Sequence, residues 1–146
     1  MIAVDTNVLV YADREESPLH ARALAALRRL AGGREAWAVP VFCIGEFLRV
    51  VSHDRVFDPP TPVLEAMASL ESLLASPSAR LLVPGEHYLP LLRRVLEESA
   101  VRGNLVFDAQ IAAICIEHGA TTLLTEDRDF TRFPGITALP LSRFAV

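Results

Sequence analysis

The stretch that decides the fold is Ile2-Ala3-Val4-Asp5-Thr6-Asn7, at the start of the chain. It begins as an apolar run and ends in a carboxylate at Asp5. Because aspartate and asparagine are poor strand residues, we expect Asp5 to lie at the carboxyl end of a buried strand. In open α/β sheets, ligands bind in the crevice beyond that end of the strands. The stretch therefore predicts a functional site close to Asp5.

The length and composition fit one folded domain over residues 1–146. The chain has 146 residues, of which 51% are hydrophobic, so it can bury a core and is not a disordered chain. No apolar run reaches the length of a membrane helix, and no charged segment followed by an apolar one opens the chain. We therefore expect a cytoplasmic protein without a membrane segment. Cys43 and Cys115 are far apart, and two lone cysteines make neither a disulfide framework nor a zinc site.

Strand-like and helix-like segments alternate along the whole chain. The expected strands cover residues 2–5, 36–39, 80–83, 121–125 and 136–139. Between them we expect a short helix over 8–12 and longer helices over 17–31, 42–52, 62–75, 88–100 and 108–118. This alternation predicts an α/β fold with a mostly parallel central sheet that helices cover on both faces.

Four acidic residues, Asp5, Glu46, Asp108 and Asp127, stand inside or beside apolar segments. Taken singly, Asp5 has the ordinary explanation of a turn residue, Asp108 of a helix N-cap and Asp127 of a loop acid. Glu46 is harder to explain, because it lies on an apolar helix, where an unpaired carboxylate is costly. Taken together, acids at one edge of a parallel sheet would repel each other unless a cation intervenes. Carboxylate oxygens of this kind suit Mg²⁺ or Mn²⁺.

The net charge of −4 argues against non-specific coating of nucleic acid but does not exclude a nuclease, whose metal site would contribute several carboxylates. All 14 basic residues are arginine. A composition bias of the source genome is the simpler explanation for the absence of lysine. The alternative explanation is that arginine suits bidentate phosphate contacts.

Four motifs of the chain resemble, in order, those of PIN-domain ribonucleases, and most of all those of the VapC toxins of prokaryotic toxin–antitoxin pairs. These motifs are Ile2-Ala3-Val4-Asp5-Thr6-Asn7-Val8-Leu9, Gly45-Glu46-Phe47, Phe107-Asp108-Ala109-Gln110-Ile111-Ala112-Ala113 and Leu124-Thr125-Glu126-Asp127-Arg128-Asp129-Phe130. The resemblance extends over nearly the whole chain. It implies a three-layer α/β/α Rossmann-like fold with a divalent metal at its mouth.

The resemblance also implies roles for individual residues and partners. It makes Asp5, Glu46, Asp108 and Asp127 the catalytic and metal-binding residues, with Thr6, Asn7, Thr125 and Asp129 as supporting polar residues. The implied reaction is hydrolysis of RNA phosphodiester bonds with Mg²⁺ or Mn²⁺. The implied partners are an RNA substrate, a small cognate antitoxin and a second copy of the chain. Near the acidic motifs, Arg14, Arg49, Arg128 and Arg132 are candidate RNA contacts, or else ordinary solvated surface.

Three other functions compete with this hypothesis. A magnesium-dependent phosphohydrolase is disfavoured, because Asp5 has no second aspartate two residues later and the chain has no lysine. A non-catalytic, protein-binding PIN-like domain is disfavoured by the intact set of acids. A PIN nuclease that acts in RNA processing or on DNA, without a toxin role, stays open on the sequence alone.

Overall fold

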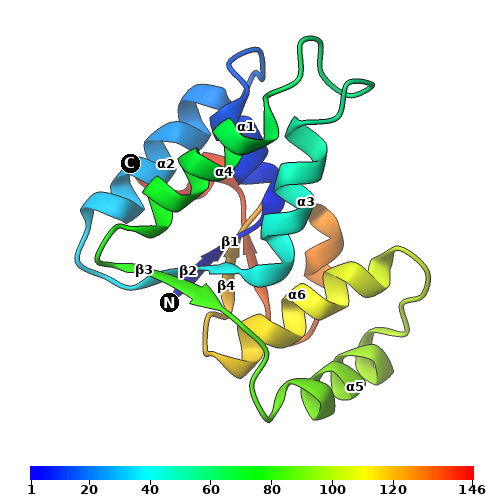
Figure 1. Cartoon of the computed structure of the whole chain (residues 1–146). Coiled ribbons are helices and arrows are strands. Elements are labelled where there is room, and N and C mark those ends of the chain that lie inside the picture. Colours follow the sequence, from blue (N-terminus) through cyan, green and yellow to red (C-terminus); the bar gives the residue numbers. More distant parts are fainter.

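The fold is built on a five-stranded parallel sheet, seen in a computed structural model that describes all of residues 1–146 (Figure 1). Its strands are β1 (Ile2–Val4), β2 (Trp37–Pro40), β3 (Ala79–Leu82), β4 (Thr122–Leu124) and β5 (Thr137–Leu139). They lie in the order β3-β2-β1-β4-β5, and every neighbouring pair is parallel. The predicted α/β fold is therefore confirmed, and the sheet is parallel throughout.

Six helices connect the strands. They are α1 (Thr6–Asp13), α2 (His20–Gly32), α3 (Val41–Val51), α4 (Val63–Leu74), α5 (Tyr88–Ser99) and α6 (Leu105–Glu117), and two short 3-10 helices follow, η1 (Arg128–Arg132) and η2 (Leu141–Arg143). Figure 1 shows α1, α2 and α4 on one side of the sheet and α5 with α6 on the other. This layering follows from right-handed crossovers, because the chain moves outward from β1 to β3 and then returns to β4.

The core lies where the central strands meet the helices. In β1, β2 and β4, Val4, Val39 and Leu123 have no exposed surface, as expected for strands covered on both faces. Helix α6 is buried around most of its circumference, which agrees with its apolar sequence. No helix combines the length and the apolar character that crossing a bilayer requires.

Two helix predictions need correction. Helix α6 begins at Leu105, three residues before the expected start, because the apolar residues before Asp108 join its first turn. Asp108 therefore lies inside that turn, and Asn104 occupies the N-cap position. In α5, the helical spacing of the apolar residues predicts Leu89 and Val95 on the inward face, but Leu89 is 72% exposed. Val95 is buried as predicted, together with Tyr88, which lies seven residues earlier and so on the same face.

The topology creates one crevice at the carboxyl edge of the sheet. Successive connections from β1 and β4 leave toward different neighbours, which makes the space between their carboxyl ends a topological switch point. Asp5 follows β1 directly, and Thr125 follows β4. The backbone amide of Asp5 donates to the carbonyl of Leu124 at 3.1 Å, so the two strand ends are held together there.

Candidate active site

Asp5 is the buried centre of the site. Its side chain caps the N-terminus of α1, where Oδ1 accepts a hydrogen bond of 2.7 Å from the backbone amide of Thr6. The other oxygen, Oδ2, accepts from the Thr125 hydroxyl at 2.7 Å and from the Asn7 side-chain amide at 3.2 Å. Only 5% of the residue is exposed. The carboxylate is therefore fixed by donors from two strand ends.

Thr125 and Asn7 extend this network to the loop after β4. The Thr125 hydroxyl donates to Asp5 and accepts from the Asn7 side-chain amide at 3.1 Å and from the Asp127 backbone amide at 3.0 Å. The side-chain oxygen of Asn7 accepts from the Glu126 backbone amide at 3.3 Å. These bonds hold the loop that carries Asp127 against the end of β1.

Three half-buried carboxylates, those of Asp108, Asp127 and Asp129, form a cluster that can hold a metal ion. One oxygen of each lies within 4.8 Å of the others. Asp127 caps η1, and its Oδ1 accepts a 2.8 Å hydrogen bond from the Asp129 backbone amide. That turn explains why Asp129, expected only as a supporting residue, stands in the cluster. Asp5 and Glu46 lie outside this trio of oxygens.

The buried position of Asp5 raises the pKa of its carboxyl from 3.8 to about 6. Burial is the largest cause, because removal from water disfavours the charged form. The hydrogen bonds from Thr125 and Thr6 work against it by stabilising the carboxylate. The negative charges of Glu46 and Asp127 raise the pKa further. Asp5 therefore lies within the electric field of two other acids of the site.

Asp108 shows the same effect more strongly, with a pKa raised from 3.8 to about 7. Its partial burial is the first cause, and the charges of Asp127, Asp5, Asp129 and Glu46 follow. Five carboxylates thus repel one another at this edge of the sheet. Hard oxygen donors under such repulsion are a chemically suitable set for a divalent cation.

Glu46 reaches the site from α3, and its environment differs from the one its sequence suggested. The residue is exposed and does not join the apolar face of that helix. One carboxylate oxygen accepts a 3.1 Å hydrogen bond from the Thr6 hydroxyl. Glu46, Asp108 and Asp129 line a groove of about 690 Å³ between α3 and the start of α6, which we call the α3–α6 groove. The expected desolvation cost at Glu46 therefore does not arise.

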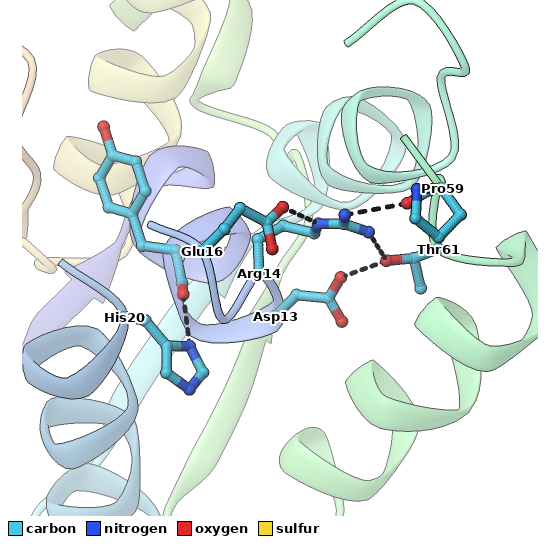
Figure 2. A network of polar contacts seen from close by, with 7 residues as sticks. Asp13, Arg14, Glu16, His20, Pro59 and Thr61 are labelled. Atoms are coloured by element: carbon cyan, nitrogen blue, oxygen red, sulfur yellow. Dashed lines mark hydrogen bonds and ion pairs between the residues drawn. The ribbon is translucent and has the colours of Figure 1, made fainter. Parts of the chain in front are cut away.

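Arg14 lies away from this cluster and makes other contacts, which Figure 2 shows. Its guanidinium donates to Glu16 at 2.7 Å, to the Thr61 hydroxyl at 2.9 Å and to the Pro59 carbonyl at 2.9 Å. It also lies over the ring of Phe57, 4.4 Å from the ring centroid. These contacts occupy the guanidinium and anchor the connection between α3 and α4, and the RNA contact of Arg14 stays a prediction.

The other three arginines lie closer to the acids. Arg49 is exposed on α3 and lines the α3–α6 groove. Arg128 is exposed at the start of η1, one residue from both Asp127 and Asp129. Arg132 pairs with Asp129 at 3.3 Å, and both side chains are 45% exposed. Arg49 and Arg128 are thus available to a ligand at this edge of the sheet.

Sequence reasoning missed one neighbour of Asp5. Cys43 is fully buried on α3, as its apolar sequence context predicts. Its sulfur, however, lies 3.8 Å from Asp5 Oδ1, within range of a weak S–H donor. Burial, followed by the charge of Asp5, holds the pKa of the Cys43 thiol well above its usual value. The thiol therefore stays protonated and able to donate, a role that its apolar sequence context does not indicate.

Comparison with known proteins agrees with this architecture. The model of the family described as PIN domain matches residues 2–136. The chain belongs to the PIN-domain family.

Its relatives within that family are VapC ribonucleases. Ribonuclease VapC43 of Mycobacterium tuberculosis is 40% identical over 133 residues, covering 91% of this chain and 90% of the relative. Ribonuclease VapC25 of the same species is 34% identical over 136 residues, covering 93% and 95% of the two chains. Among solved structures, VapBC2 from Rickettsia felis bound to a DNA fragment from their promoter contains a chain with a similar fold. The TM-score is 0.69 at 21% identity, over 96% of this chain and 98% of that one.

Proposed function

We propose that this chain is a divalent-metal-dependent endoribonuclease that hydrolyses RNA phosphodiester bonds. The observation that carries the proposal is the convergence of the Asp108, Asp127 and Asp129 carboxylates within 4.8 Å, two of which, Asp108 and Asp129, also line the α3–α6 groove. Membership of the PIN-domain family and relatives named as ribonucleases support the same reaction.

Each acid has a role that fits its position. Asp108, Asp127 and Asp129 offer converging oxygens to Mg²⁺ or Mn²⁺, and Asp5 and Glu46 complete the negative site around them. When bound, the cation lowers the pKa of a water molecule and neutralises charge on the phosphate. Thr6, Asn7 and Thr125 orient these carboxylates through the hydrogen bonds that they donate. A carboxylate of the groove accepts the proton of the attacking water.

The substrate that fits this groove is single-stranded or looped RNA, because cleavage requires an accessible backbone. Arg49 and Arg128 are exposed beside the acids and supply positive charge for the phosphates. Arg132 is already paired with Asp129 and is a weaker candidate. The net charge of −4 means that phosphate contacts are confined to such local positions.

We also propose that the enzyme is the toxin of a toxin–antitoxin pair, acts in the cytoplasm as a homodimer and consists of a single domain over residues 1–146. Two observations support this role: the 40% identity to a VapC ribonuclease, and the fold shared with a VapBC complex. A strongly negative site attracts basic side chains, so a small antitoxin with such residues would bind over the acids. Charge pairing of this kind strengthens a complex when the groove is desolvated, by an amount that varies between systems.

Expression of the protein alone and together with its genomic neighbour tests the biological role. Expressed alone, the protein should arrest growth and degrade cellular RNA. Co-expression of the neighbour should restore growth and keep the RNA intact. Growth arrest that the neighbour does not relieve would contradict the toxin–antitoxin role but not the nuclease activity. Normal growth and intact RNA with the protein alone, alongside an equally harmless Asp5→Asn variant, would remove the toxic nuclease.

A further inference from the structure

Phe107 is the one aromatic residue of the chain that is exposed. The protein contains seven phenylalanines, two tyrosines and one tryptophan. The other nine are buried or half-buried, whereas Phe107 is 63% exposed. It forms no pair with another aromatic ring. Most of its surface is therefore open to solvent or to a ligand.

The place of this ring is as unusual as its exposure. Phe107 lies in the first turn of α6, immediately before Asp108, and it lines the α3–α6 groove that also contains Glu46 and Asp129. An exposed aromatic ring thus borders the acids to which the chemistry has been assigned. Such a position indicates a ligand with both a flat apolar face and a phosphate.

The opposite wall of the groove leaves room for such a ligand. On α3, Gly45 is exposed, and a Cβ atom added there would meet no heavy atom within 4 Å. One turn further, Arg49 is not among the four arginines that form an ion pair with a carboxylate, so its guanidinium is free for a ligand. The groove therefore combines an aromatic ring, open space and a free guanidinium beside a cluster of acids.

We propose that Phe107 stacks on a base of the RNA substrate next to the scissile phosphate. This inference rests on the proposed ribonuclease function and extends it to substrate positioning. Unpaired bases of RNA stack on aromatic side chains, which tolerate any base because every base has a π-face. Arg49 is the group on the same groove that contacts the adjoining phosphate. The free ring, the open wall at Gly45 and the unpaired cation favour a nucleotide over a purely apolar peptide side chain.

Tryptophan at position 107 provides a direct test, because the native Trp37 is fully buried and cannot report on ligands. The Phe107→Trp variant is mixed rapidly with single-stranded hexauridylate in Mg²⁺, and its fluorescence is followed before cleavage. Base stacking should quench the emission. An abasic ribose-phosphate oligomer of equal length should leave the emission unchanged, and quenching by that oligomer would contradict the proposal.

Kinetics supply the second measurement. Phe107→Ala should raise the KM for short single-stranded RNA about tenfold, the scale of one lost base stack, with kcat nearly unchanged. Phe107→Tyr should restore KM to within about twofold, since its ring stacks as well. Leu89→Ala is the matched control, because Leu89 is 72% exposed but lies on α5, outside the groove. It should leave KM unchanged.

The outcomes separate this inference from the proposed function. If the wild-type protein cleaves no RNA, the ribonuclease function fails, whereas the quenching experiment still tests base binding. If the wild-type protein cleaves RNA but Phe107→Ala keeps its KM and Phe107→Trp is not quenched, the stacking role is wrong. Loss of antitoxin binding in Phe107→Ala, with RNA KM unchanged, would assign the ring to a protein contact and likewise overturn it.

Discussion

The charge of Asp5 should weaken the metal-free protein, and Asp5→Asn should reveal by how much. The carboxyl is 5% exposed, and its pKa is raised from 3.8 to about 6. A raised folded-state pKa means that the folded protein binds the proton more tightly than the unfolded chain. The stabilising contribution is therefore fully present below pH 3.8 and is lost as the pH rises through about 6.

The magnitude follows from the size of this shift. About two pKa units at 1.36 kcal/mol each correspond to about 3 kcal/mol of unfolding free energy over the whole titration, of which the wild-type protein loses about 2 kcal/mol between pH 4.5 and pH 8. Asparagine has no charge to desolvate, so this loss disappears in the variant. A pH-independent penalty of about 1 kcal/mol remains, because the new amide faces the donor of Asn7 where the carboxylate accepted a hydrogen bond. The variant should thus be about as stable as the wild-type protein at pH 4.5 and about 2 kcal/mol more stable at pH 8.

Urea unfolding in EDTA at pH 4.5, 6 and 8 measures this difference. Asp58→Asn is the control, since Asp58 is exposed and lies outside the site. The stability of Asp5→Asn relative to wild type should rise by about 2 kcal/mol over this range, and that of the control should stay constant. A difference between wild type and Asp5→Asn that does not change with pH would refute the assignment of a buried, repelled carboxylate.

Three further predictions concern Asp108, Arg14 and the binding of Mg²⁺. Asp108→Asn should leave the melting temperature in EDTA at pH 8 unchanged or higher, because it removes a half-buried charge that Asp127 and Asp5 repel; a clear fall would contradict this. Arg14→Ala should lower the unfolding free energy in a urea titration by about 1–3 kcal/mol, because it breaks the bond to Thr61, yet leave the KM for RNA unchanged. A raised KM would return Arg14 to the RNA surface. Mg²⁺ should raise the melting temperature of the wild-type protein at pH 8, and EDTA should reverse this rise. The melting temperature of Asp127→Asn should rise much less, and an equal rise would place the ion elsewhere.

Most of the fold was predictable because its signals are local. Short apolar runs marked the strands, and their alternation with helical segments predicted a parallel sheet. The two helix starts that were predicted wrongly also have local causes. The expected helix at Ser17 begins at His20, because the Ser17 hydroxyl and carbonyl accept from Leu19 and His20 and form a turn first. Likewise, three residues before Asp108 are helical although the acid looked like the start.

The sequence predicted which acids lie at this edge of the sheet, but not how they are arranged there. Which acids approach one another depends on contacts between segments far apart in the chain. Asp129 enters the cluster through a two-residue turn capped by Asp127, and Glu46 on α3 is exposed and accepts a hydrogen bond from the Thr6 hydroxyl. The contacts of Arg14 were not predicted for the same reason, since its partners Pro59 and Thr61 lie more than forty residues away in the chain. No sequence pattern specifies such contacts.

Cleavage of single-stranded RNA by the purified protein tests the central claim most directly. Labelled RNA is incubated with wild type, Asp127→Asn and Glu126→Gln across a titration of Mg²⁺ and Mn²⁺, and with EDTA. Glu126 is the matched control, because its carboxylate accepts from the Leu141 amide at 2.7 Å and stands outside the cluster. Wild type and Glu126→Gln should cleave only with metal, and Asp127→Asn should be slower by at least about a hundredfold. Intact RNA at every metal concentration, or equal rates for wild type and Asp127→Asn, would contradict the account.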